Sequence, residues 1–392
     1  MNLGRRALGA VLVLTAIAAG CGHSAQSTGS ATGSTTSSSP STVAPNHAVY
    51  ASIGNFTVGV TTMRLPSGTK VEVWYPANGG VGFGSDTYDV RSFLPAAVAG
   101  RLDPKVHAYV STDANRDVVV GAAGERFPLV VFSHGDAGFR DESTFLTARL
   151  ASWGMVVAAP DHPSRDLAAA LSHSVGPIPT DVADILGTID LVRRQNARAG
   201  GPFRDRIDLS KVAVVGYGAG GRAAMKAAAD PRVAGYVALA SDRRDPAAAG
   251  AAIKLPAKPS LFVAGAADRV VSPTETTAAY RAAPAPSYEW VIDGAGHNAF
   301  DDLCVVANQQ GLVAFADRAG IGSLVPTSLA AVLTDGCRAP DLAVLKTWPI
   351  IDQVVTGFLR HVIGPDRVAV GLEPAGTRTI AGVKVTVSAR TR

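Results

Sequence analysis

The sequence is poor in cysteine, in clustered positive charge and in long apolar segments. Its 392 residues include three cysteines, which excludes a disulfide-rich scaffold. No run of lysine and arginine stands out in a chain of formal net charge +4, so a nucleic-acid partner is not expected. After the N-terminal region, no segment has about 18 uncharged apolar residues in succession, so no spanning helix is expected there.

The composition is that of a folded protein with a large core. Hydrophobic residues make up 47% of the chain and charged residues 17%. A typical domain size would allow two or three domains, but large α/β sheets often form one longer domain. One α/β domain over residues 47–392 is the simplest account.

The first 20 residues have the pattern of a secretory signal peptide. Arg5 and Arg6 precede the apolar run 7–19, which ends in small residues before Cys21. The run is too short to span a bilayer stably, so a cleaved signal is favoured over an uncleaved anchor. Residues 18–21 resemble a bacterial lipobox, although Ala18 stands where leucine is commoner. We therefore expect export, with lipidated Cys21 anchoring the chain to the outer face of the bacterial cell membrane.

Residues 21–46 are rich in Ser, Thr, Gly and Ala, which predicts a flexible tether. If Cys21 carries lipid, Cys304 and Cys337 remain as a pair in an oxidising compartment. A disulfide is the natural expectation, although two separate buried thiols would also fit the sequence. The residues between them, about 305–337, form an insertion that we expect to be partly helical and to cover the edge of the site.

Apolar runs and turn signals alternate along most of the chain. The runs 58–65 and 70–76 flank a Pro-Ser-Gly-Thr turn, which predicts a hairpin. Helical spacing predicts helices over 141–153 and 181–196, and a capping box at 272–275 starts another. Six apolar runs are typical of buried parallel strands: 128–134, 154–162, 211–217, 233–241, 260–268 and 288–297.

This alternation predicts an α/β fold with a mostly parallel central sheet and helices on both faces. Near the C-terminus, a further hairpin is predicted between residues 368–372 and 382–388.

The stretch VAVVGYGAGG, residues 212–221, fits two known motifs. Residues 216–221 satisfy G-x-G-x-x-G, the dinucleotide fingerprint, and Asp242 lies where a ribose ligand would be expected. The same residues differ by one position from the G-x-S-x-G nucleophile elbow, because Gly218 stands in place of serine. The fingerprint normally follows the first strand of its fold, whereas several strands precede this one. The elbow is therefore favoured, and a nucleotide-dependent oxidoreductase is kept as a third hypothesis.

Three more elements follow predicted strands. The loop after residues 132–135, Phe-Ser-His-Gly, can supply backbone N–H groups to an oxyanion hole. Asp268 and His297 follow two later strands, so the chain order is elbow, acid, histidine, as in α/β-hydrolases. Each residue alone has a structural explanation, but together they predict a catalytic site at one edge of the sheet. Ser133 and Tyr217 are less favoured as substitute nucleophiles, because neither sits at the apex of the elbow.

Segments 58–77, 132–166 and 208–221 resemble platelet-activating-factor acetylhydrolases and related dienelactone-hydrolase-like esterases of the α/β-hydrolase superfamily. The resemblance covers most of residues 55–300. It implies an ester hydrolase in which Asp268 is the triad acid and His297 the base. It also implies that the main chains of Gly135, Asp136 and Ala219 flank the oxyanion hole. We expect neither a metal nor another cofactor.

Gly218 departs from the pattern of that family. Glycine has no side chain and cannot form an acyl-enzyme, so this route is closed at residue 218. We therefore expect an exported lipoprotein with a broken triad, impaired in catalysis, that binds a small ester- or lipid-like ligand. In the alternative, His297 oriented by Asp268 activates water directly against an ester, and the protein is an active hydrolase. The acyl group and the oligomeric state do not follow from the sequence.

Overall fold

The structure is a computed structural model that describes residues 48–79, 84–121, 124–172, 180–306, 311–372 and 376–391. By its contacts the chain divides into Met1–Ala44 and Pro45–Arg392, and every described residue lies in the second unit. The predicted signal peptide, Cys21 and the tether lie outside the described residues. Among the described helices, none combines the length and apolar character that a membrane span needs.

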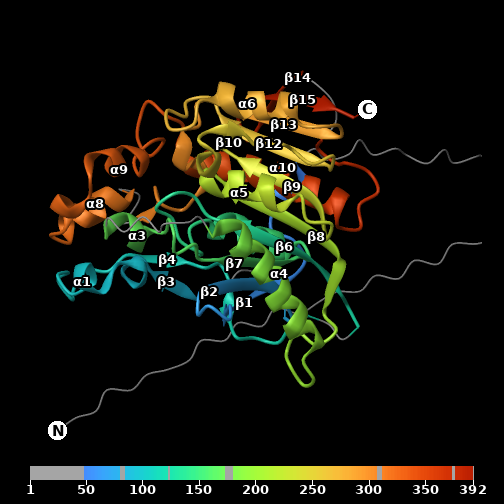
Figure 1. The fold of residues 1–392 in the computed structure, drawn as a ribbon, viewed down its shortest axis with the longest axis horizontal. Helices are drawn as coiled ribbons and strands as arrows, with labels where there is room; N and C mark the ends of the chain where they lie inside the picture. Colours follow the sequence, from blue (N-terminus) through green and yellow to red (C-terminus); the bar gives the residue numbers. More distant parts are fainter. Residues whose placement is uncertain are drawn as a thin grey trace, which may run out of the picture. The chain divides into compact units, whose positions relative to one another are not determined.

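An 11-stranded sheet forms the centre of the second unit (Figure 1). The strand order is β14-β15-β13-β12-β9-β8-β6-β7-β2-β1-β5, and the six strands from β13 to β7 are parallel. β2 and β15 pair antiparallel with the two ends of this parallel set. The bounds are β1 Thr57–Arg64, β2 Lys70–Ala77, β5 Asn115–Arg116, β6 Phe127–Ser133, β7 Val156–Pro160, β8 Ile207–Tyr217, β9 Val233–Leu239, β12 Ser260–Gly265, β13 Ser287–Ile292, β14 Gly376–Ile380 and β15 Val383–Arg390.

Helices cover both faces of the sheet, as predicted. α2 (Thr144–Ser152) and α10 (Val344–Val362) contribute to the hydrophobic cluster on one face. α4 (Asp181–Ala197), α5 (Ala219–Ala227) and α6 (Pro273–Ala282) contribute to the cluster on the other face. These elements confirm the α/β fold with a mostly parallel sheet.

The strand β6 shows why the central runs are apolar throughout. Val130 and Phe132 belong to one hydrophobic cluster, and Leu129 and Val131 belong to the other. Successive side chains of a strand point to opposite faces, so a strand covered on both faces must be apolar at every position. Period-2 alternation is therefore absent from this strand, and the run reads as continuously hydrophobic.

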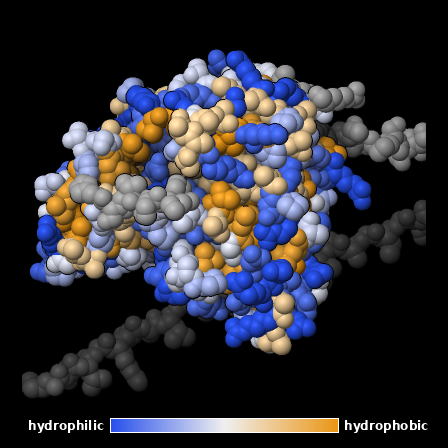
Figure 2. Space-filling model, in the orientation of Figure 1, coloured by the Kyte–Doolittle hydropathy of each residue, from blue (hydrophilic) through white to orange (hydrophobic). Residues whose placement is uncertain are grey.

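A third hydrophobic cluster lies where smaller elements gather at one end of the unit (Figure 1). It includes Phe93, Phe139, Leu167 and Phe315, all buried. Figure 2 shows hydrophobic side chains on this side of the molecule over α8 and α9. The smaller elements there are α1 Ala96–Ala99, α3 Leu167–Leu171, α8 Gly311–Arg318, α9 Thr327–Val332, β3 Thr87–Asp89 and β4 Tyr109–Ser111. A separate two-stranded sheet consists of β10 Arg244–Asp245 and β11 Ala251–Ala252.

The two predicted hairpins have different outcomes. The N-terminal one is confirmed, because β1 and β2 pair antiparallel from Arg64↔Lys70 to Thr57↔Ala77. The C-terminal one is half wrong: β15 forms as predicted, but its partner is β14, and residues 368–372 form no strand. The reason is the turn. Ala381 and Gly382 both have positive φ, which makes a two-residue hairpin turn that pairs Ile380 with Val383.

Candidate active site

The site elements follow strands whose C-terminal ends meet at the middle of the sheet. From β6 the chain continues to β7 on one side, whereas β8, β9, β12 and β13 extend to the other side. Open α/β sheets bind ligands in the crevice at such a reversal of strand order. The loops after β6, β8, β12 and β13 carry the predicted oxyanion loop, Gly218, Asp268 and His297, so the topology brings all four together.

Gly218 has the backbone conformation of a nucleophile elbow. It joins β8 to α5 with φ 54° and ψ −118°. Serine in an elbow holds such a strained strand-to-helix conformation, and strain of this kind costs on the order of 1–3 kcal/mol. Glycine adopts positive φ at no steric cost. The turn therefore keeps the shape that presents a nucleophile, although residue 218 has no side chain.

Two neighbouring glycines are required by close packing, whereas Gly218 is not. A β-carbon on Gly216 would lie 2.0 Å from the carbonyl oxygen of Gly220, and one on Gly220 would lie 2.0 Å from that of Ser133. A β-carbon on Gly218 would meet nothing closer than His297 Nε2, at 3.6 Å, which is an ordinary contact. Strand–helix packing thus explains Gly216 and Gly220 without a nucleotide, and residue 218 has room for a side chain.

Asp268 and His297 form a buried pair beside that position. His297 Nδ1 lies 2.9 Å from Asp268 Oδ2, and the two residues are 5% and 6% exposed. Asp268 Oδ1 accepts the N–H groups of Val270 and Val271 at 2.9 and 2.8 Å, which fixes the carboxylate. The bond to Asp268 orients the ring so that Nε2 faces Gly218. In the described part of the chain, Nε2 has no hydrogen-bond partner.

The oxyanion loop is held from two sides. Arg165 Nη1 donates to the carbonyl oxygens of His134 at 2.7 Å and of Gly135 at 2.5 Å. From the other side, Glu142 Oε1 accepts the Gly135 N–H at 2.5 Å. Because the C=O and N–H of a trans peptide point in opposite directions, the bond from Arg165 to the Gly135 carbonyl turns the Asp136 N–H away from Arg165.

The three predicted oxyanion residues therefore differ in whether their backbone N–H groups are free to bind a ligand. The N–H of Gly135 is used by Glu142 and is not available to a ligand. The N–H groups of Asp136 and Ala219 have no acceptor among the described residues. Ala219 is the first residue of α5, where a backbone N–H has no partner within the helix. Two main-chain donors remain, one from the oxyanion loop and one from the elbow.

These groups surround a cavity of about 160 Å³. His297 and Gly218 lie on it together with Asp136 and Ala219. The other polar residues on the cavity are Glu142, Arg222, Asp242, Asn298 and Asp301. Its apolar wall consists of Tyr217, Val270, Val271, Leu303, Val332 and Leu333. No cluster of His, Cys, Asp or Glu side chains in the described residues has an arrangement that would hold a metal ion.

Three acidic or phenolic groups on this cavity have pKa values raised by burial. Burial raises the pKa of Glu142 to about 8. Burial, together with the nearby Glu142 carboxyl, raises the pKa of Asp301 well above its ordinary value. Burial and the Asp301 carboxyl raise the pKa of Tyr217 in the same way. Tyr217 therefore keeps its phenolic proton and is a poor substitute nucleophile.

A second Ser-His-Asp set lies beneath the oxyanion loop, and sequence reasoning missed it. Ser133 Oγ is 2.8 Å from His162 Nε2, and His162 Nδ1 is 3.2 Å from Asp184 Oδ2. All three residues are buried, and none lies on the cavity. Arg165 Nη2 donates to Ser133 Oγ at 3.1 Å. Ser133 therefore positions the loop through Arg165 and is not accessible as a nucleophile.

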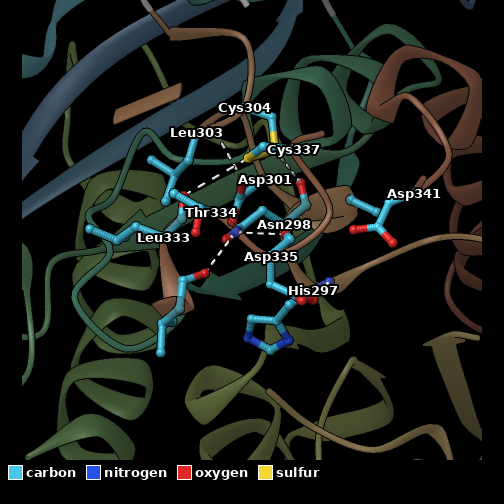
Figure 3. Close-up of a disulfide and its surroundings, with 12 residues drawn as sticks. His297, Asn298, Asp301, Leu303, Cys304, Leu333, Thr334, Asp335, Cys337 and Asp341 are labelled. Atoms are coloured by element: carbon cyan, nitrogen blue, oxygen red, sulfur yellow. Dashed lines mark hydrogen bonds between the residues drawn. A yellow bond between two sulfur atoms is a disulfide. The ribbon is translucent and has the colours of Figure 1, made fainter. Parts of the chain in front are cut away.

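Cys304 and Cys337 form the predicted disulfide (Figure 3). Between them lie α8 and α9, and Val332 and Leu333 at the end of α9 reach the cavity. Leu303, next to Cys304, lies on the same cavity. The residues bounded by the disulfide thus form part of the wall of the site.

The same segment also holds the histidine in place. Asp335 Oδ2 accepts the backbone N–H of His297 at 2.8 Å. Asn298 Nδ2 donates to the carbonyl oxygens of Val332 at 2.8 Å and Asp335 at 2.9 Å. Figure 3 shows the His297 ring pointing away from the disulfide, below these contacts. Asp335 and Asn298 were not among the predicted site residues, because their role depends on a loop contact with no sequence motif.

A protein-family model described as platelet-activating factor acetylhydrolase, isoform II, matches residues 66–181. The match spans less than a third of the chain. It includes β2, β6, the oxyanion loop, α2 and β7, and it ends before the elbow, Asp268 and His297. No curated protein matches the sequence. The family match and the strand order together confirm the α/β-hydrolase fold and the resemblance to that family.

Proposed function

We propose that this protein is an exported lipoprotein whose esterase-like site binds a small ester- or lipid-like ligand without acyl-enzyme turnover. One observation carries the proposal: Gly218 has the elbow conformation beside a hydrogen-bonded His297–Asp268 pair. The supporting parts of a hydrolase site are present, and the nucleophile is the part that is missing.

The geometry supports ligand binding more directly than turnover. The N–H groups of Asp136 and Ala219 can hold a carbonyl oxygen, as an oxyanion hole does. His297 Nε2 faces residue 218, where an elbow serine would donate its proton. Since Gly218 offers no oxygen, a bound ester is not attacked by the chain. Loss of the serine in a Ser-His-Asp site lowers kcat by about 10⁶-fold.

A second candidate function follows from the space beside His297. A water molecule between Nε2 and a bound ester would be activated by His297 as a general base, with Asp268 orienting the ring. Residual catalysis of about 10³–10⁴-fold over water is typical of sites that keep the oxyanion hole but lose a triad member. In this case the protein is a slow carboxylic-ester hydrolase.

Steady-state kinetics of the wild type, His297→Ala and Asp268→Asn on p-nitrophenyl acetate and butyrate separate the two candidates. A binder hydrolyses these esters at the same low rate with and without His297. A water-activating enzyme loses about 10²-fold or more with either variant, since general-base catalysis is worth that much. His361→Ala, in the last turn of α10, is the matched control and should leave the rate unchanged.

The export part of the proposal rests on the first 21 residues. Expression of the full chain in a bacterium that lipidates exported proteins should place it in the membrane fraction with an acylated N-terminal Cys21. Cys21→Ala should release the chain from that fraction. Retention of Cys21→Ala in the membrane, or a mature mass without lipid, would contradict anchoring.

A further inference from the structure

A second hollow, of about 380 Å³, lies between β4, the start of α2, residues 302–305 and the start of α10. Among the described residues, it shares no lining residue with the cavity at Gly218. We propose that this hollow binds a small primary ammonium ion with an aromatic or alkyl body. The inference goes beyond the proposed function and does not rest on it.

The charge of the hollow favours a cation. Among the described residues that line it, the only charged side chains are Asp113 and Asp302, and none is lysine, arginine or histidine. Asp113 accepts a hydrogen bond from Ser111 and Asp302 accepts from Thr144, so these partners are uncharged. Burial, and to a smaller extent the Asp113 carboxylate, raises the pKa of Asp302 to about 7. A ligand cation would therefore stabilise two acids that otherwise repel each other.

Asp302 offers the ligand an acceptor that the chain does not use. The residue is 1% exposed, and its Oδ2 accepts the N–H and the hydroxyl of Thr144 at 2.8 and 2.5 Å. Its Oδ1 has no hydrogen-bond partner among the described residues. Buried polar atoms without a partner are rare, and a charged N–H donor makes the stronger kind of hydrogen bond to a carboxylate. This oxygen favours an ammonium that carries N–H groups over a fully methylated one.

Aromatic and aliphatic side chains form the rest of the wall. Phe145 and Trp348 stack with their ring centroids 4.6 Å apart, and aromatic faces attract cations. Tyr109 and Leu345 are 61% and 47% exposed, and they are two of the five large hydrophobic side chains exposed in the described part of the chain. Exposed apolar side chains that gather in one place mark a binding site more often than scattered ones do.

The volume of the hollow sets the size of the ligand. At about 380 Å³ it is more than twice the ~150 Å³ cavity that holds benzene in an engineered protein. One aromatic ring with a short chain therefore fits, with the ring against the apolar wall and the ammonium at the two acids.

Isothermal titration calorimetry of the full chain at pH 8 tests the inference, because the Asp302 carboxyl is largely ionised at this pH. The probes are 2-phenylethylammonium, its N-trimethyl analogue, 2-phenylethanol and 3-phenylpropionate. The primary ammonium should bind about tenfold or more tightly than the alcohol and the carboxylate, since a hydrogen bond to a charged group is worth that much. It should also bind more tightly than the trimethyl analogue, which has no N–H group for Asp302.

Two substitutions locate the bound cation. Asp113→Asn preserves shape, and asparagine tolerates the positive φ of 50° at residue 113. Asp302→Asn removes the charge of the buried acceptor, and Asp113→Asn keeps the test decisive if that variant fails to fold. Each should weaken binding of 2-phenylethylammonium about fivefold or more. The controls are Glu125→Gln, which removes an exposed acid elsewhere, and His297→Ala, in the other cavity, and both should keep the wild-type affinity.

Equal affinity for 2-phenylethylammonium and 2-phenylethanol would overturn the inference, because the hollow would then select shape and not charge. Absence of binding by the primary ammonium would also overturn it. Binding that survives both aspartate substitutions but is lost in His297→Ala would place the ligand in the cavity at Gly218 and would contradict a second site.

Discussion

His297 Nε2 lies 3.6 Å from the point where a β-carbon on Gly218 would stand. A serine at this position would bring its hydroxyl to the lone pair of an imidazole that Asp268 already orients. The glycines on either side of this position are held by backbone packing, but Gly218 is not. Residue 218 therefore has space for a side chain, which is the basis of the proposal that the site lacks its nucleophile.

The first prediction concerns the glycines of the elbow. Gly218→Ala should lower the free energy of unfolding by about 1–2 kcal/mol, because a β-carbon at positive φ is strained but meets no close neighbour. Gly220→Ala should cost about 3 kcal/mol or more, because its β-carbon would overlap the Ser133 carbonyl. Urea unfolding of both variants measures the difference. Equal losses would show that packing constrains the two positions alike.

A second prediction concerns pH. Glu142 keeps its proton up to about pH 8 in the folded state, whereas its ordinary pKa is 4.5. Between these values the unfolded chain binds fewer protons, so the contribution of Glu142 to stability falls as pH rises from about 4.5 to 8. The fall is at most about 1.4 kcal/mol per pH unit. Glu142→Gln should therefore show a shallower loss of stability over this window in urea unfolding at several pH values.

The matched control for this experiment is Glu125→Gln, because Glu125 is exposed. It should keep the wild-type pH profile. Asp302 and Asp352, whose pKa values burial raises to about 7 and about 8, contribute slopes of the same sign and remain in both variants. A Glu142→Gln profile that overlays the wild type would show that this carboxyl does not hold its proton when folded.

The disulfide supports a third prediction. Cys304 and Cys337 are separated by 33 residues, so replacing both with alanine should cost about 3–4 kcal/mol in the chain-entropy model. Amide hydrogen exchange should accelerate at His297 and Asn298, whose N–H groups are accepted by Asp335 in the bridged segment. Exchange within β15 serves as the internal control. An equal increase in exchange rate in both regions would indicate global destabilisation. It would contradict a local role of the disulfide in positioning His297.

Arg165 supports a fourth prediction, tested in the Gly218→Ser background. Its guanidinium reaches two carbonyls and Ser133 at once, which the point charge of lysine cannot do. Arg165→Lys should misorient the Asp136 N–H and lower kcat by about 10–100-fold, with KM nearly unchanged, since loss of an oxyanion donor costs about 10²–10³. Arg193→Lys, on the exposed face of α4, is the control. Equal effects on kcat and KM would contradict a role in orienting this group.

The sequence predicted those parts of the molecule that depend on local pattern. Continuous apolar runs marked the parallel strands, and the order of Gly218, Asp268 and His297 placed three loops at one edge. Groups that act through distant contacts were missed. Neither Glu142 nor Arg165 belongs to a sequence motif. Each holds the oxyanion loop through hydrogen bonds that form only in the folded chain. Asp184 joins Ser133 and His162 only because α4 packs behind β6 and β7.

At the C-terminal hairpin, the local pattern predicted a strand that does not form. The apolar residues 368–372 looked like a strand, but Ala369 and Leu372 pack against the core cluster instead. The polar segment β14 pairs with β15 because the Ala381–Gly382 turn dictates that register. Turn geometry outweighed hydrophobic pattern at this edge of the sheet.

The central claim is that this site lacks a nucleophile and nothing else. The direct measurement is the kcat of Gly218→Ser on p-nitrophenyl butyrate, compared with the wild type and with Gly218→Ser combined with His297→Ala. The account predicts a gain of about 10³-fold or more in the single variant, removed by the second substitution. A folded Gly218→Ser protein with no gain, or a gain that survives loss of His297, would contradict it.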